Sequence, residues 1–240
     1  MTVGTKLQPA DEWIQALKNG VMTRGRDFTK HPLITGIRDG RLTQAQLRLW
    51  VQQNYIPIRS VLEKGPINLD PIPEPWKTKT YENDLEERTG AFSKTTDHPS
   101  LWRKFGRSLG LTDQEMQQAR SLLPTAAYMF FGEWASKCRP WFYRSITGGP
   151  LEDQVPRAWR IILPALRRHY KLSADATQFF DVHISVDEQH GDTFYDILKT
   201  FATTAEMREE LGHACNHTLD LFWEHLMIPL TYDPVTVLGR

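Results

Sequence analysis

The sequence has few cysteines, no excess of either charge and no long apolar run. Only two of its 240 residues are cysteines, too few for a disulfide framework, so a reducing compartment is the default. The 29 basic residues balance 29 acidic residues, and no basic cluster marks a surface for nucleic acid or an anionic membrane. No apolar stretch is long enough to span a bilayer, and no signal peptide is recognisable. We therefore expect a cytoplasmic protein with neither nucleic acid nor a membrane as partner.

Most of the chain instead has the hydrophobic pattern of helices. Period-two alternation is scarce, whereas capping boxes, Thr43 with Gln46 and Thr112 with Glu115, mark the starts of helices. A chain of this length with 40% hydrophobic residues can bury one substantial core. We expect an all-α fold, a helical bundle that forms a single domain over residues 1–240.

Glycine and proline predict where these helices end. Thr89-Gly90 should end one helix, and the sequence TGGP at 147–150 should separate a helix that runs from Pro124 to about Ile146 from the next one. Further helices are expected over 151–170, 173–201 and 204–228.

The helix expected over 173–201 carries a candidate set of metal ligands. His183, Asp187 and His190 are spaced at i, i+4 and i+7, which places them on one face of a helix. Two imidazoles and a carboxylate without a thiolate suit iron better than a soft metal. An exposed polar stripe has the same spacing, so the motif alone leaves both interpretations open.

Two other segments can supply further donors. A dinuclear site in a helical bundle needs carboxylates and imidazoles from facing helices. The segment TYENDLEERTG ends with Glu86 and Glu87, the loop after it leads to His98, and PLEDQVPRAW contributes Glu152. Glu63 is a possible extra ligand, although a solvated charge is the interpretation we favour.

Three blocks of sequence extend this pattern: ENDLEERTGAFSKTTDHPSLW, LEDQVPRAWRIILPALRRHY and FFDVHISVDEQH. In this order and at these distances they resemble the haem-oxygenase-like non-haem diiron oxidases and oxygenases, relatives of the TenA and PqqC folds. The resemblance covers much of residues 78–200 and implies a haem-oxygenase-like helical bundle that binds two iron ions, Fe(II) or Fe(III), with O2 as co-substrate. It also implies six metal ligands: Glu87, His98, Glu152, His183, Asp187 and His190.

The same resemblance separates the chain from one branch of the family. Glu87 is preferred to Glu86, which stays a possible extra ligand, because Glu87 lies four residues after Asn83 as in the family pattern. The self-sacrificing p-aminobenzoate synthases carry a tyrosine after a His-Pro pair and a lysine after the Glu-x-Gln-x-Pro motif. This chain has Leu33-Ile34 and Ile162 at those places, which argues against self-sacrificing chemistry.

The resemblance implies an O2-dependent oxidoreductase of a biosynthetic pathway that acts on a small molecule, an amino acid or derivative, including an aromatic one. The expected outcomes are N-oxygenation, C–C cleavage with decarboxylation, or formation of a nitrile or alkene. An external electron donor and a homodimer are further expectations. Arg59, Arg144 and Tyr143 are candidates for binding the substrate.

Two alternatives come from other classes of protein. The first is a metal-independent TenA-like hydrolase with a nucleophilic cysteine, although neither Cys138 nor Cys215 lies in a recognisable setting for it. The second is a non-catalytic helical binding protein. His213 and His217 are also spaced for a metal, but we expect a structural or surface role because no carboxylate partner follows the family pattern there.

Overall fold

The computed structural model describes residues 7–239, together with their side chains except those of 21–23 and 185–191. Every regular element in this part of the chain is a helix, so the all-α prediction is confirmed. The elements are α1 Ala10–Thr23, η1 Phe28–Lys30, α2 Pro32–Arg38, α3 Gln44–Glu63, α4 Trp76–Thr89, α5 His98–Ser108, α6 Asp113–Gln117, α7 Leu123–Lys137, η2 Trp141–Arg144, α8 Ser145–His169, α9 Gln178–Phe201, α10 Ala205–Thr231 and α11 Pro234–Leu238.

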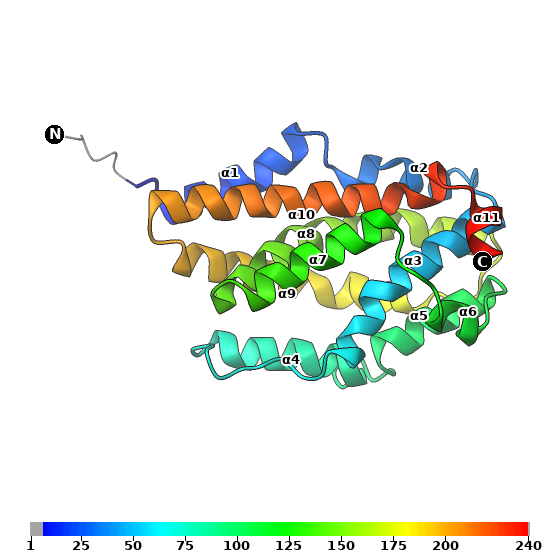
Figure 1. Ribbon diagram of the computed structural model, residues 1–240, viewed down its shortest axis with the longest axis horizontal. Helices are drawn as coiled ribbons and strands as arrows, with labels where there is room; N and C mark the ends of the chain where they lie inside the picture. Colours follow the sequence, from blue (N-terminus) through cyan, green and yellow to red (C-terminus); the bar gives the residue numbers. More distant parts are fainter. Residues whose placement is uncertain (1–6, 240) are drawn as a thin grey trace.

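The long helices form an elongated bundle (Figure 1). Helix α10 runs along one long side with α7 and α8 beside it, α9 packs against α8, and α4 lies at the opposite edge. The rings of Trp50, Trp102, Phe105 and Phe180 make edge-to-face contacts where α3, α5 and α9 meet. The indole of Trp102 also donates to the Val51 carbonyl over 2.9 Å, which fixes α5 against α3. Across residues 7–239, no helix combines the length and the apolarity that crossing a membrane requires.

The predicted capping boxes are both present. Thr43 caps α3 and Thr112 caps α6, and in each case the side chain three residues later bonds back to the backbone of the cap. Helix α9 begins at Gln178 rather than at 173, because Ser173 caps a separate turn through the amide of Ala176. The starts of these helices were therefore predicted to within a few residues.

The predicted break at 147–150 is wrong. Helix α7 ends at Lys137 instead of near Ile146, and α8 begins at Ser145 and continues through the glycines. The real break contains Pro140, which has no amide N–H and disfavours a helical conformation in the residue before it.

The glycines serve a helix contact instead. A Cβ atom on Gly148 would lie 2.7 Å from the ring of Phe194 on α9. Their absence of side chains lets α8 approach α9 closely, and this packing outweighs the low helix propensity of the segment.

Gly90 ends α4 with a conformation that few other residues adopt. Its φ of +64° lies in the left-handed region, and a Cβ atom there would lie 2.6 Å from the backbone oxygen of Thr96. The turn brings the following loop back across the end of α4, so that α5 begins beside it.

Two histidines are buried in the core without charge partners. Nδ1 of His31 accepts from the amide of Leu33, and Nε2 donates to the carbonyl of Trp223. Nε2 of His225 lies 2.6 Å from Oδ1 of Asn54. Burial lowers the pKa of His31 to about 4, against the opposing effect of the bond to Trp223, and burial lowers the pKa of His225 to about 3.

We predict that the protein loses stability as the pH falls from about 6.5 to about 4. Both imidazoles are neutral in the folded state but take up protons in the unfolded chain near pH 6.5, so each lowers the free energy of unfolding by about 1.4 kcal/mol per pH unit in this window. Urea unfolding at successive pH values measures the slope. His31→Asn, which keeps a capping side chain, should reduce the slope, whereas His213→Asn on the surface should leave it unchanged. An unchanged slope in the first variant contradicts the account.

We also predict opposite effects of two glycine-to-alanine changes. Gly90→Ala should lower the free energy of unfolding by about 2 kcal/mol or more, because the left-handed conformation and the contact with Thr96 both disfavour a Cβ atom. Gly212→Ala in α10 should raise it by about 0.5–1 kcal/mol, since nothing lies within 4 Å of the new atom. Equal effects in thermal and urea unfolding would show that the Gly90 turn is not strained.

Candidate metal centre

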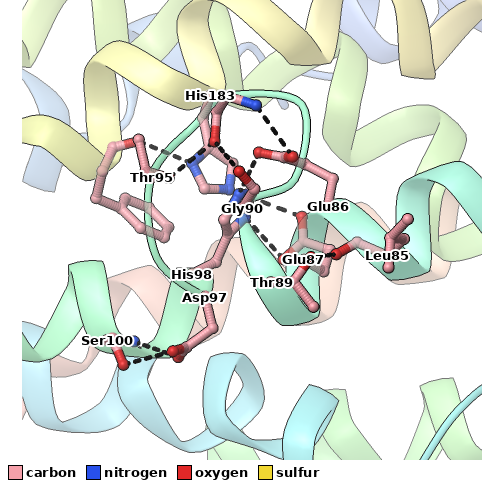
Figure 2. A network of polar contacts seen from close by, with 12 residues as sticks. Leu85, Glu86, Glu87, Thr89, Gly90, Thr95, Asp97, His98, Ser100 and His183 are labelled. Atoms are coloured by element: carbon pink, nitrogen blue, oxygen red, sulfur yellow. Dashed lines mark hydrogen bonds and ion pairs between the residues drawn. The ribbon is translucent and has the colours of Figure 1, made fainter.

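Three predicted ligands from three helices converge in the structure. Glu87 lies near the end of α4, His98 is the first residue of α5, and His183 lies on α9. One potential ligand atom from each lies within 4.8 Å of the others (Figure 2). These are the only residues that form such a group among the described side chains.

The start of α5 places His98 in this group. Asp97 caps the helix by accepting from the amide of Ser100 over 2.8 Å, and Pro99 occupies the first turn, where its missing N–H costs nothing. The imidazole of His98 is 2% exposed and lies 4.4 Å from that of His183, centre to centre.

The backbone of α9 fixes the tautomer of His183. Its Nδ1 lies 2.8 Å from the carbonyl oxygen of Phe179, which can only accept, so Nδ1 carries the proton. The neutral ring therefore has its lone pair on Nε2, which lies 4.0 Å from Oε1 of Glu87. This is the arrangement in which a histidine is ready to bind a metal ion.

Both nitrogens of His98 face carboxylates. Nδ1 lies 2.9 Å from Oε2 of Glu87, and Nε2 lies 3.4 Å from Oε1 of Glu86. Burial acts to lower the pKa of His98, but the close contact with the charged Glu87, followed by that with Glu86, outweighs it and raises the pKa. Despite the short distance to Glu87, Nδ1 is buried and lacks a hydrogen bond of good geometry. A cation bound at this nitrogen would replace its proton.

Glu86 orients this histidine and the loop before it. The side chain is 1% exposed, and its Oε2 accepts from the amides of Phe92 over 2.7 Å and Ser93 over 3.2 Å. Burial acts to raise the pKa of Glu86, but the bonds from Ser93, Phe92 and His98 outweigh it and lower the pKa. Both oxygens are therefore in use, which favours Glu87 over Glu86 as the ligand, as the sequence pattern indicated.

The three side chains fit an iron ion. Two imidazole nitrogens and a carboxylate oxygen are donors that suit divalent iron. In a six-coordinate site with bonds of about 2.1 Å, neighbouring donors lie about 3 Å apart and opposite donors about 4 Å. Oε2 of Glu87 lies 2.9 Å from Nδ1 of His98, and Oε1 lies 4.0 Å from Nε2 of His183, so each imidazole lies within the range of donor separations from one of the two carboxylate oxygens.

The remaining three predicted ligands stay predictions. Glu152 on α8 does not belong to the three-residue group, although its Oε2 is shielded from solvent. It lies close enough to Tyr128 for its negative charge to raise the pKa of that phenol, in addition to the larger effect of burial. Asp187 and His190 lie outside the residues whose side chains are described.

Other candidates have structural contacts that occupy them. Glu63, the possible extra ligand, is half exposed and pairs with Arg59 over 3.2 Å. Arg59, a candidate for binding substrate, also donates to the Met116 carbonyl. The hydroxyl of Tyr143 is held by Arg139 and Glu210, and its role in binding substrate stays a prediction.

The second pair of histidines has surface contacts. His213 is exposed and lies 3.9 Å from Glu209, and the ring of His217 packs edge-on against Phe131. These contacts agree with the structural or surface role that we expected for both histidines.

The sequence reasoning did not single out Asn83 as a side chain with a function of its own. It precedes Glu87 by one helical turn and lines a cavity beside the candidate centre together with Arg144. The signal was the spacing of four residues, which puts Asn83 and Glu87 on the same face of α4.

Comparisons with known proteins identify the family. Residues 68–223 match the model of a family described as iron-containing redox enzymes. Relatives include a 4-aminobenzoate synthase of Nitrosomonas europaea, 24% identical over 94% of this chain and 91% of its own, and one of Chlamydia pneumoniae, 23% identical over 89% and 93%.

Solved structures share the fold. One is a Shewanella denitrificans domain of unknown function with a haem-oxygenase-like fold, with a TM-score of 0.69 and 16% identity over 95% of this chain and 93% of that one. Another is a TenA family protein from a Silicibacter species, described as a transcription regulator, with a TM-score of 0.72 and 13% identity over 93% and 99%. The family match covers more than half of the sequence and includes Glu87, His98 and His183. The chain belongs to the family of iron-containing redox enzymes and has the haem-oxygenase-like fold.

Proposed function

We propose that this protein is an O2-dependent oxidoreductase that holds two iron ions and oxidises an amino acid or a close derivative in a biosynthetic pathway. The observation that carries the proposal is the meeting of Glu87, His98 and His183 in the interior of the bundle. The family of iron-containing redox enzymes supports iron as the metal. The second iron, the electron donor and a homodimeric assembly rest on the resemblance described above.

The bound iron ions would supply the activation of O2 and the transfer of electrons. The carboxylate of Glu87 would neutralise part of the positive charge of the iron. Its two oxygens face two different imidazoles, those of His98 and His183. His183 keeps its proton on Nδ1 through Phe179 and offers Nε2. His98 would give up the proton on Nδ1, and Glu86 would still accept from Nε2 and hold the ring in place.

Aromatic side chains would exclude water from the side of the centre where His183 lies. The rings of Phe179 and Trp159 lie 4.0 Å and 5.0 Å from the His183 ring, centre to centre. Apolar neighbours lower the local dielectric and protect reactive species from hydrolysis. Donors for a second ion would come from Glu152, Asp187 and His190, as the resemblance implies.

The substrate is proposed to be a separate small molecule. Relatives named as 4-aminobenzoate synthases make an aromatic amino acid, which supports an aromatic amino acid or derivative as the substrate class. In this chain, Leu33, Ile34 and Ile162 are buried in the main core cluster. Packed aliphatic side chains at these positions offer no phenol or amine for a self-sacrificing reaction.

A metal-independent hydrolase is the second candidate, favoured by the structural likeness to TenA proteins. A cysteine nucleophile needs an accessible thiolate. Burial raises the pKa of the Cys215 thiol to about 12, and Cys138 lies exposed at the end of α7. Neither cysteine belongs to the group around Glu87.

We expect anaerobic loading with ferrous iron to give close to two iron ions per chain. His98→Ala and His183→Ala should each lose iron and O2 consumption, because each change removes one of the two imidazole nitrogens that converge with Glu87 and could bind the metal. Iron analysis after gel filtration measures the first effect, and an oxygen electrode the second.

His213→Ala is the matched control, because the same change is made on an exposed helix face. It should keep both the iron and the O2 consumption of the parent protein. Circular dichroism establishes that all three variants are folded. Iron content that stays near zero in the parent, or survives both changes at the centre, would sink the proposal in favour of the hydrolase or a binding protein.

Glu86→Gln should weaken iron binding by about 10- to 100-fold while leaving the chain folded, because an amide does not orient His98 as a carboxylate does. Competition with a chelator measures the affinity. Glu209→Gln, on an exposed part of α10, is the matched control and should bind iron like the parent. Complete loss of iron, as in the histidine variants, would identify Glu86 as a ligand instead.

A further inference from the structure

A cavity of about 320 Å³ lies along the two helices that carry Glu87 and His183. Residues of α4 and α9 form opposite walls, and the junction of η2 with α8 closes it. This volume is within the range of sites for small molecules. Its lining includes Asn83, Trp141, Arg144, Ser145, Phe194 and Ile197.

The cavity is adjacent to the candidate metal centre. Asn83 precedes Glu87 by four residues, which corresponds to about 6 Å along α4. Phe194 and Ile197 lie farther along α9 than His183, toward its C-terminal end. Because the same pair of helices flanks both features, a molecule in the cavity would extend toward the three converging side chains.

Arg144 brings a guanidinium to a lining that also contains Lys79 and Glu82, and no described carboxylate, Glu82 included, forms an ion pair with it. Among the described side chains, none forms an ion pair or a hydrogen bond with its guanidinium. The charge of Asp84 acts on this guanidinium, but both oxygens of that carboxylate are bound by Arg88 at 3.0 Å and 2.9 Å. Burial lowers the pKa of Arg144, with Asp84 acting in the opposite direction, so the guanidinium has lost part of its hydration. A desolvated guanidinium is suited to a planar carboxylate, which it binds through two hydrogen bonds.

Asn83 on α4 adds an unused acceptor to the same lining. Its Oδ1 is buried, and within the described part of the chain it has no hydrogen-bond partner. Buried polar atoms are nearly always paired, so an orphaned acceptor in a cavity indicates a donor that the protein does not supply. An amine N–H of a ligand is such a donor.

The lining also contains the charged side chains of Lys79 and Glu82, and another part of the wall is apolar. Trp141, Phe194 and Ile197 contribute rings and an aliphatic side chain. The site thus has a cation for a carboxylate, an acceptor for an amine and an apolar surface for a side chain.

We propose that this cavity binds an amino acid with an aromatic or other apolar side chain. Arg144 binds its carboxylate, Oδ1 of Asn83 accepts from its amino group, and the side chain packs among Trp141, Phe194 and Ile197. The identification of this ligand as the substrate rests on the proposed function, whereas its binding does not require iron chemistry.

Calorimetric titration of the full-length protein tests the proposal, both without iron and after anaerobic ferrous loading. The probes are L-phenylalanine, 3-phenylpropionate, which lacks the amine, and phenethylamine, which lacks the carboxylate. L-phenylalanine should bind saturably in both preparations, and phenethylamine should bind at least about tenfold more weakly because it leaves Arg144 without an anion.

Two variants separate the roles of the polar groups. Arg144→Gln should weaken the binding of L-phenylalanine and 3-phenylpropionate by at least about tenfold and leave the binding of phenethylamine unchanged. Asn83→Leu should lower the affinity for L-phenylalanine to that for 3-phenylpropionate, which lacks the amine. Arg157→Gln, on the exposed face of α8, is the matched control and should bind like the parent.

The outcomes distinguish this proposal from the one for iron. If folded parent protein binds none of the three probes, or if Arg144→Gln binds L-phenylalanine as the parent does, the cavity is not an amino acid site, whatever the iron content. If the binding pattern is as expected but iron is not taken up, the cavity assignment stands and the oxidoreductase proposal fails.

Discussion

The carboxylate of Glu87 faces the imidazoles of His98 and His183, and the candidate centre depends on this contact. The three residues belong to α4, α5 and α9, so the contact exists only if these helices meet at one place. The left-handed turn at Gly90 and the cap at Asp97 determine how the chain leaves α4 and enters α5. The turn and the cap, together with the packing of the three helices, therefore position the side chains of Glu87, His98 and His183.

Three ionisable side chains at the centre are buried: Glu86, His98 and His183. A buried charge is costly unless it is paired or hydrogen-bonded. Glu86 meets this condition through two backbone amides and His98, and it ties the loop after α4 to the histidine that follows it. His98, between two carboxylates, holds a position that a proton or a metal ion can fill. The same contacts that stabilise the loop thus prepare the histidine for a cation.

The arrangement also bears on the substrate that we propose. The haem-oxygenase-like bundle is shared by proteins with different names, and a fold alone does not specify an activity. Here the additional information comes from the cavity between α4 and α9, where Arg144 and Asn83 offer complementary groups beside the centre. The close approach of α8 to α9 at Gly148 places Phe194 at this cavity, so residues far from the ligands in sequence help to shape it.

The sequence by itself determined the helical class, the capped starts of α3 and α6 and the end of α4, because these features depend on residues within a few positions of one another. It also predicted Glu87, His98 and His183 through resemblance to a family. The tertiary structure decided what local patterns leave open. Helix α8 continues through glycines that looked like a break, because contact with α9 stabilises them in a helix. Arg59 and Arg144 looked alike in sequence, but only the packing of distant helices gives one arginine carbonyl partners and leaves the other facing a cavity.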